Sequence, residues 1–297
     1  MPLCDHGKLR NYGNSERFKT ILRFTVVPKC WFTHFYALGL VANTLFLTDI
    51  FIFRGSFVTT WVQTRSACCS NAFRIDGASE LGVECLLCLC MMQLQLVRRL
   101  WECLRVTQWG NSSMSTLGYL VGILHYQSAV LTFLAESPYF EGVLGASIDE
   151  SSGLKHLLYV GWLMVSGFKA RHVGALSLFF LGWVKQHQAI RHLASLRTHG
   201  AGDGNGNTKD GKGKCSSSYG LPSEGWFRFV SSPHYLAEAL TYISFVVVTK
   251  GRTLGVLLMM VWVLANQALV AVGTHAWYLK KFERCPNGWK RMIPWVW

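Results

Sequence analysis

The chain has few charged residues, and acidic residues are the scarcest of these. Only 15% of its 297 residues are charged, with 16 Asp and Glu against 29 Lys and Arg. Soluble domains average about 25% charged residues, so this composition argues against a soluble enzyme. Hydrophobic residues make up 51% of the chain, and the mean hydropathy is positive at +0.24. Both values are typical of a membrane protein.

Motifs for several common kinds of site are missing. No Gly-x-Gly-x-x-Gly follows a predicted strand, which excludes a Rossmann nucleotide site. Cys85, Cys88 and Cys90 have a spacing that resembles a metal motif, but they lie inside the apolar run 81–97. No matching pair of His or Cys follows at zinc-finger spacing, so we expect no metal. The sequence also shows no internal repeats.

The net charge of +13 does not predict a nucleic-acid partner. The Lys and Arg residues lie between apolar runs and not in one patch, which is the distribution found in the cytoplasmic loops of membrane proteins. We therefore expect no nucleic acid.

Six apolar runs are candidates to cross a bilayer, which takes about 20 mostly apolar residues as a helix. They are 31–53, 81–97, 117–134, 173–184, 235–248 and 254–272, some short or interrupted by polar groups. The apolar stretch 157–184 contains three basic residues near its centre, and we interpret it as an interfacial segment followed by one span. The last two runs predict a hairpin around 249–252. The predicted fold is an all-α, polytopic transmembrane helical bundle of about six spans.

Charge predicts the orientation of these spans. Basic residues precede the first span and follow the second, and they dominate the segment after the fourth and the C-terminal tail, whereas the loop after the third span is acidic. The positive-inside rule places both termini, the N-terminal segment 1–30 and the 185–234 loop in the cytosol. Within that loop, 198–218 is rich in Gly, Asn, Lys and Ser and is expected to be a flexible insertion.

Polar side chains next to the cytosolic ends of the spans are the candidate site. Glu238 is the most informative, because an ionisable group within a membrane helix is costly and usually functional; the alternative is a carboxylate that reaches the headgroups. Arg suits phosphate oxygens, and Tyr can stack on a nucleotide base. Cytosolic cations can also simply anchor helices to anionic lipid. The candidates for binding a cofactor are Arg99, Gln186, Arg197, Tyr219, His234, Glu238, His275 and Tyr278.

Several ordered segments together resemble the steroid 5α-reductase family, and within it the polyprenol reductase branch. The matching segments are 27–36, 97–103, 219–222, 226–227, 230–238, 266–269, 274–278, 282–283 and 293–295. Because these segments occur in the family's order over most of the chain, the resemblance is specific.

The resemblance implies NADPH bound in the cytosolic half of the C-terminal helices. It divides the chain into a transmembrane substrate-binding half, 31–184, and a steroid 5α-reductase-like domain, 185–297, and it assigns the cofactor contacts to the eight candidates named above. It also implies a multi-pass protein of the endoplasmic reticulum membrane. The family normally has seven spans, so six suggests a chain shortened at its N-terminus.

Two departures from the family pattern fall near the implied cofactor site. Glu224-Gly225 stands where the family has Gly-Asp or Gly-Gly, and Trp289 follows Cys285-Pro286 where the family ends in Tyr-Pro-x-x-Arg. These changes leave open a catalytically inactive lipid-binding protein.

The reaction implied by the resemblance is reduction of the α-isoprene double bond of polyprenol or polyprenal, which leads toward dolichol and N-glycosylation. Hydride adds readily to a C=C bond that is conjugated to a carbonyl, so chemistry favours the aldehyde. A donor must then stabilise the enolate oxygen. The Glu–Tyr pair of the steroid reductases has no match here, where Gln95 and Leu96 stand instead. The catalytic candidates are His34 and Tyr36, and His125 and Tyr126 are further options.

Other functions remain open at this point. A 3-oxo-steroid 5α-reductase and a trans-enoyl-CoA reductase belong to the same superfamily, and the steroid enzyme would need the missing Glu–Tyr pair. A membrane methyltransferase of related C-terminal architecture would use S-adenosylmethionine and would not need Arg197 near a 2′-phosphate.

Overall fold

A computed structural model describes residues 26–53, 57, 78–110, 112–135, 153–202, 220–282, 285–286 and 288–297. In this part of the chain the helices are α2 (Phe32–Phe51), α4 (Ala78–Arg105), α5 (Thr116–Ala135), α7 (Gly153–Ser166), α8 (Ala170–Gly202), α9 (Pro233–Val248) and α10 (Leu254–Lys281). Short 3-10 turns, η3 (Lys29–Trp31) and η4 (Gly225–Arg228), precede α2 and α9. The predicted all-α class is confirmed.

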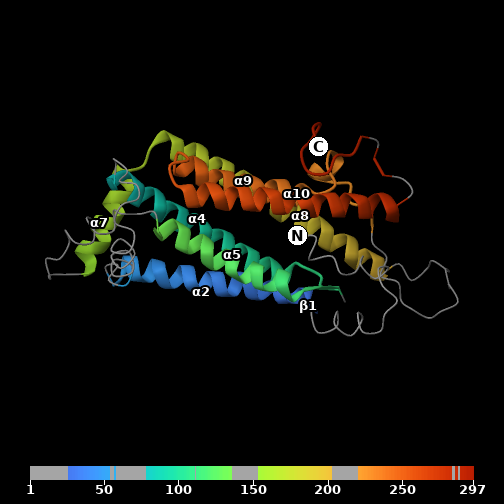
Figure 1. Ribbon diagram of the computed structural model, residues 1–297, viewed down its shortest axis with the longest axis horizontal. Coiled ribbons are helices and arrows are strands. Elements are labelled where there is room, and N and C mark those ends of the chain that lie inside the picture. Colours follow the sequence, from blue (N-terminus) through green and yellow to red (C-terminus); the bar gives the residue numbers. More distant parts are fainter. Residues whose placement is uncertain are drawn as a thin grey trace.

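The helices other than α7 run along the long axis of an elongated bundle, and α7 lies across one end of it (Figure 1). Two three-residue strands, β1 (Val26–Pro28) and β2 (Ser113–Ser115), pair antiparallel and bring the start of α2 beside the start of α5. We call this end of the bundle the strand end. The opposite end carries α7 and the connection between α9 and α10 (Figure 1), and we call it the turn end.

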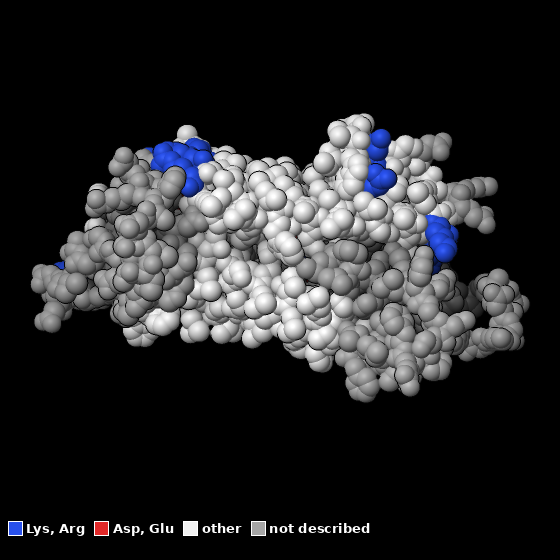
Figure 2. Space-filling view, viewed as in Figure 1, with Lys and Arg blue, Asp and Glu red and all other residues white. Residues whose placement is uncertain are grey.

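The apolar character of the bundle marks a multi-pass membrane protein. Three of the described helices are long and apolar enough to cross a bilayer: Lys29–Phe51, Thr116–Leu134 and Leu254–Lys281. The other predicted spans coincide with α4, α8 and α9, of which α9 has only 16 residues. On the face shown in Figure 2, described Lys and Arg lie toward the two ends and leave an uncharged band between them. Such a band matches the hydrocarbon layer of a bilayer.

The apolar stretch 157–184 is divided between two helices. Helix α7 ends at Ser166, and α8 begins at Ala170 after a short non-helical segment that contains Lys169. The basic side chains predicted near the centre of this stretch therefore lie at the turn end. There Arg171 forms an ion pair with Glu84 of α4 and donates to the Val248 carbonyl at 3.4 Å. A break at this point keeps these charges out of the middle of a span.

Helices α8 and α9 pack closely against each other. A Cβ placed on Gly182 would lie 2.5 Å from the Ala237 carbonyl oxygen and 2.9 Å from Thr241 Oγ1. Only glycine allows the two backbones to approach this closely. The Thr241 hydroxyl donates to the Ala237 carbonyl, so the hydroxyl at this contact is buried with a hydrogen-bond partner.

The predicted hairpin between the last two spans is confirmed. Helix α9 ends at Val248, and α10 begins at Leu254. Lys250 and Gly251 both have positive φ, at 53° and 65°, which turns the chain back within a few residues. The two helices consequently run antiparallel, with Glu238 of α9 beside Gln267 of α10.

Substituting Gly182 by Ala tests the α8–α9 contact. We expect Gly182→Ala to lower the free energy of unfolding by about 1–3 kcal/mol, because the added methyl group clashes with backbone atoms of α9. Gly174→Ala is the matched control, since a Cβ there meets nothing within 4 Å on the same helix. Thermal unfolding in detergent should show a lower midpoint for Gly182→Ala only. Equal midpoints for both variants would contradict the close approach.

Candidate active site

A cavity of about 390 Å³ lies between α2, α4, α5, α8, α9 and α10 and reaches Lys29 at the strand end. Its polar lining is Lys29, Tyr36, Arg99, His125, Tyr126, Gln186, His234, Tyr235, Glu238, Asn266 and Gln267. Its apolar lining comes mainly from α2, α5 and α10 and includes Phe32, Phe35, Val121, Trp262, Val263 and Val270. The cavity thus combines ionisable groups with a surface that suits a lipid.

A buried carboxylate organises the α4 wall of the cavity. Glu102 is fully buried, and its two oxygens pair with Arg98 at 2.8 Å and with Arg99 at 2.5 Å. His187 of α8 lies 2.8 Å from the same carboxylate. Arg98 also donates to Gln95 at 2.9 Å and to Gln186. These contacts satisfy a carboxylate that would otherwise be very unfavourable away from water.

Arg99 holds Tyr36 at the cavity wall. Its guanidinium donates two hydrogen bonds to the Tyr36 hydroxyl oxygen, at 3.2 Å from Nε and 2.8 Å from Nη2. A phenol oxygen that accepts two hydrogen bonds keeps its own O–H free to donate elsewhere. The Tyr36 ring also packs against the Tyr126 ring, with centroids 5.1 Å apart. The site therefore presents a fixed hydroxyl donor beside a buried cation.

The wall formed by α9 and α10 carries a second polar group. The Gln267 amide donates to a Glu238 carboxylate oxygen at 2.6 Å. One turn earlier on α9, the His234 ring contacts Tyr235, with centroids 4.0 Å apart. Its Nδ1 atom is buried and has no hydrogen-bond partner among the described residues. This wall offers an amide, a carboxylate and an imidazole to a polar ligand.

The structure brings five of the predicted site residues to this cavity. Tyr36, Arg99, Gln186, His234 and Glu238 all line it. They come from α2, α4, α8 and α9, so the cavity joins both predicted halves of the chain.

Four other predicted residues lie outside the cavity lining. His34 is exposed, with its ring 2.9 Å from the Tyr119 hydroxyl. Arg197 donates to the Gln108 carbonyl near the far end of α8. His275 and Tyr278 lie farther along α10. Tyr219, and most of the predicted flexible insertion 198–218, lie outside the described residues.

Trp289, one of the two departures from the family pattern, has a clear structural place. Its indole N–H donates to the Phe227 carbonyl at 2.6 Å, and its ring contacts Tyr278 and His275. The backbone of Lys290 continues this contact by pairing with Val230. Trp289 thereby ties the C-terminal segment to the loop that precedes α9.

Comparison with known proteins agrees with this architecture. The family model described as 3-oxo-5-alpha-steroid 4-dehydrogenase matches residues 158–297. Polyprenal reductase 1 of Oryza sativa subsp. indica is 30% identical over 92% of this chain and 80% of its own. Polyprenal reductases of Caenorhabditis elegans and Ailuropoda melanoleuca are each 28% identical, over 97% and 99% of this chain and 86% and 85% of their own. The chain belongs to the polyprenal reductase branch of the steroid 5α-reductase family.

The sequence analysis gave no role to Gln267 or Glu102. Gln267 contacts Glu238, and Glu102 organises both arginines of α4. His125, which the sequence offered as a further catalytic option, lines the cavity with its Nε2 2.8 Å from the Tyr242 hydroxyl. Each is a polar residue within an apolar helix, and the cost of burying it was the available signal. The partners of these three residues on other helices, however, lie 29 to 117 residues away along the chain.

Removing the buried carboxylate should destabilise the reductase-family fold. We expect Glu102→Ala to reduce the free energy of unfolding by about 3–5 kcal/mol, because it leaves Arg98 and Arg99 buried without their counter-ion. Glu224→Ala is the control, since that side chain is 78% exposed. The measurement is thermal or denaturant unfolding in detergent micelles. A Glu102→Ala protein as stable as the control would show that the network contributes little.

Proposed function

We propose that this protein reduces the α-isoprene double bond of polyprenal with NADPH, on the path from polyprenol to dolichol that supports N-glycosylation. The observation that carries the proposal is the cavity in which Tyr36, held by Arg99, stands among apolar walls and faces the helices that bear Glu238 and Gln267. The relatives named polyprenal reductase support the choice of substrate.

The residues of α8, α9 and α10 fit a nicotinamide cofactor. A carboxamide and ribose hydroxyls need both donors and acceptors, which Gln267, Glu238 and Gln186 provide. The buried and unpartnered His234 Nδ1 is a polar atom that a bound ligand would satisfy. When bound, NADPH supplies the hydride. These side chains would orient the ring, and the cavity's apolar lining would exclude water.

Tyr36 is the group best placed to assist the reaction. Hydride addition at the β-carbon of an unsaturated aldehyde moves negative charge to the carbonyl oxygen, and the α-carbon then takes up a proton. The Tyr36 O–H can donate to that oxygen while the Arg99 cation stabilises the charge through the phenol. Preorganised donors of this kind contribute about 2.7–4 kcal/mol in other enzymes.

The chemistry of the acceptor favours the aldehyde over the alcohol. An isolated C=C bond in an allylic alcohol accepts hydride poorly, whereas conjugation to a carbonyl makes the β-carbon electrophilic. The Tyr36 hydroxyl contributes most to the rate when a negative charge develops on the oxygen to which it donates. A site built around such a donor therefore supports polyprenal as the species reduced.

The proposed setting is the endoplasmic reticulum membrane, with the cofactor site on the cytosolic side. The cavity lining includes Lys29 at the strand end, and Lys280 and Lys281 end α10 at the same end of the bundle (Figure 1). This is the end that the distribution of basic residues assigns to the cytosol, from which NADPH would bind. The isoprenoid chain would extend from the apolar walls of α2, α5 and α10 into the bilayer.

Removing the Tyr36 hydroxyl tests its catalytic role. We expect Tyr36→Phe to lower kcat for polyprenal reduction about 10²–10³-fold, as loss of one oxyanion donor does elsewhere, with little change in KM for NADPH. The control is Tyr119→Phe, which removes a hydroxyl from the pair with His34 at the rim of the bundle. The assay follows saturated product from purified enzyme, NADPH and a long-chain polyprenal. If Tyr119→Phe lost activity and Tyr36→Phe kept it, the Tyr36 proposal would be wrong and His34, the partner of Tyr119, would be the donor.

Neutralising Glu238 tests the cofactor wall. We expect Glu238→Gln to raise KM for NADPH about 10–100-fold, because a hydrogen bond to a buried charged group contributes about 1.5–3 kcal/mol. Asn266→Ala is the control. Asn266 directly precedes Gln267 on α10, and its substitution should raise KM for NADPH much less. An unchanged KM in Glu238→Gln would place the cofactor elsewhere. Formation of a methylated product with S-adenosylmethionine and without NADPH would overturn the reductase proposal itself.

A further inference from the structure

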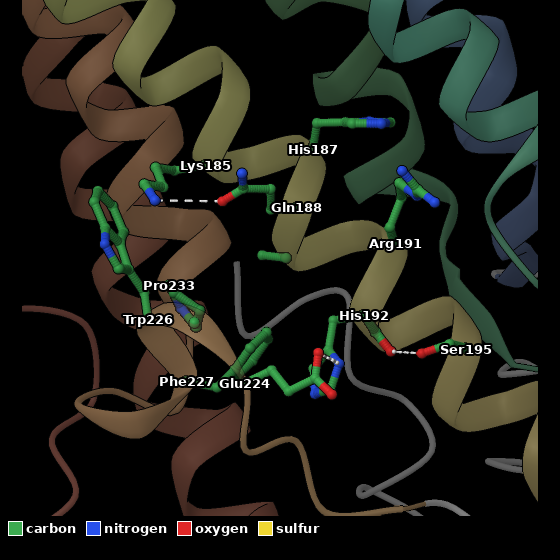
Figure 3. Close-up of a pocket in the computed structure, with 12 residues that line it drawn as sticks. Lys185, His187, Gln188, Arg191, His192, Ser195, Glu224, Trp226, Phe227 and Pro233 are labelled. Atoms are coloured by element: carbon green, nitrogen blue, oxygen red, sulfur yellow. Dashed lines mark hydrogen bonds and ion pairs between the residues drawn. The ribbon is translucent and has the colours of Figure 1, made fainter.

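A second cavity, of about 420 Å³, is lined by α8 and by the segment that precedes α9 (Figure 3). We call it the outer groove. It is lined by Lys185, His187, Gln188, Ala189, Arg191, His192, Ser195, Glu224, Gly225, Trp226, Phe227 and Pro233. None of these residues lines the active-site cavity, where α8 contributes Gln186 and Ile190 instead. The outer groove is therefore a separate site.

The outer groove continues an exposed apolar stripe along α8. Val173, Phe180, Leu181 and Val184 are 42–55% exposed and repeat at helical spacing on one face. The next exposed positions on that face are Gln188, Arg191 and Ser195, all in the groove. From Val173 to Val184 the helix rises about 17 Å, which is more than half of the roughly 30 Å hydrocarbon layer.

The change from apolar to basic residues along this face marks the membrane surface. Trp226 lies beside Lys185 at this level, with the Lys185 ammonium 5.6 Å from the centre of its ring. Trp residues are enriched at the boundary between hydrocarbon and headgroups. The outer groove is thus at headgroup depth, directly above a surface that acyl chains would cover.

The charges of the outer groove favour an anion. Lys185 donates to Gln188 at 3.3 Å, and the exposed Arg191 has no hydrogen bond or ion pair with any described residue. Glu224 is the acidic side chain of the lining, and its carboxylate lies 3.3 Å from His192 (Figure 3). Even with His192 neutral, Lys185 and Arg191 against Glu224 leave the groove with a formal charge of +1, and guanidinium groups bind phosphate oxygens well.

We propose that the outer groove binds the phosphate headgroup of an anionic phospholipid, with the acyl chains lying along the stripe from Val173 to Val184. The groove supplies the cations, Trp226 marks the headgroup depth, and the apolar stripe continues below it. The phosphate of a soluble nucleotide shares this chemistry, but it would leave the apolar stripe without a role.

Lipid retention measured with matched charge variants tests the proposal. The full-length protein is placed in nanodiscs of phosphatidylcholine with phosphatidylserine, and bound lipid is counted by native mass spectrometry. We expect Lys185→Gln/Arg191→Gln to lower the apparent affinity for phosphatidylserine about thirtyfold, since each substitution removes a direct charge-assisted hydrogen bond to the phosphate, and each such bond contributes at least a factor of about five. Thermal unfolding in pure phosphatidylcholine should be unchanged, which shows that the variant is folded.

The control removes the same charge from the same end of the bundle. Lys280 and Lys281 are exposed in the last turn of α10, outside the groove, and Lys280→Gln/Lys281→Gln should weaken phosphatidylserine binding less than about threefold. If the two double variants lost phosphatidylserine affinity equally, the loss would come from general electrostatic attraction, and the proposal of a specific site would be wrong. Weakened binding of 2′,5′-ADP in detergent, with lipid retention unchanged, would assign the groove to a nucleotide and overturn the proposal as well.

Discussion

The buried Glu102 carboxylate is the interaction on which the rest of the site depends. It holds Arg98 and Arg99 on α4 and is in contact with His187 on α8. Without it, two guanidinium groups would be buried without a counter-ion, which is strongly unfavourable. With it, Arg99 is fixed in a position where its N–H groups meet the Tyr36 hydroxyl. A buried charge that is costly on its own thus sets the geometry of the hydroxyl that we propose as the catalytic donor.

The network also joins parts of the chain that are distant in sequence. The contact of Glu102 with His187 links α4 to α8, and the Gly182 contact links α8 to α9. Gln267 then connects α10 to Glu238 of α9. Two polar networks, joined by the packing of α8 against α9, thus hold the α2 and α4 wall and the wall opposite it. The region matched by the family model, 158–297, provides only part of these networks.

The sequence predicted the elements of the fold better than it predicted the site. The helical spans, the hairpin and the end at which polar groups gather follow from apolar runs and charge, which are local properties. The site depends on contacts between distant segments. The sequence pattern gave no reason to prefer Tyr36 over His34, which is two residues away. The structure distinguishes them, because Tyr36 contacts Arg99 at the cavity whereas His34 contacts Tyr119 outside it. Pairing of Gln267 with Glu238 was likewise invisible in the sequence.

The balance of charge around the cavity explains how this site can work within a membrane. Lys29 and Arg99 line the cavity with Glu238, and Arg98 and Glu102 lie behind its α4 wall, so three cations face two carboxylates and the formal net charge is only +1. A cavity of this kind can hold an apolar aldehyde in its resting state without a large field. Negative charge that develops on the substrate oxygen then meets the Tyr36 hydroxyl and the adjacent Arg99 cation at short range, where few water molecules screen it. The attraction is greatest in the transition state, which is the condition for a higher rate rather than tighter binding alone.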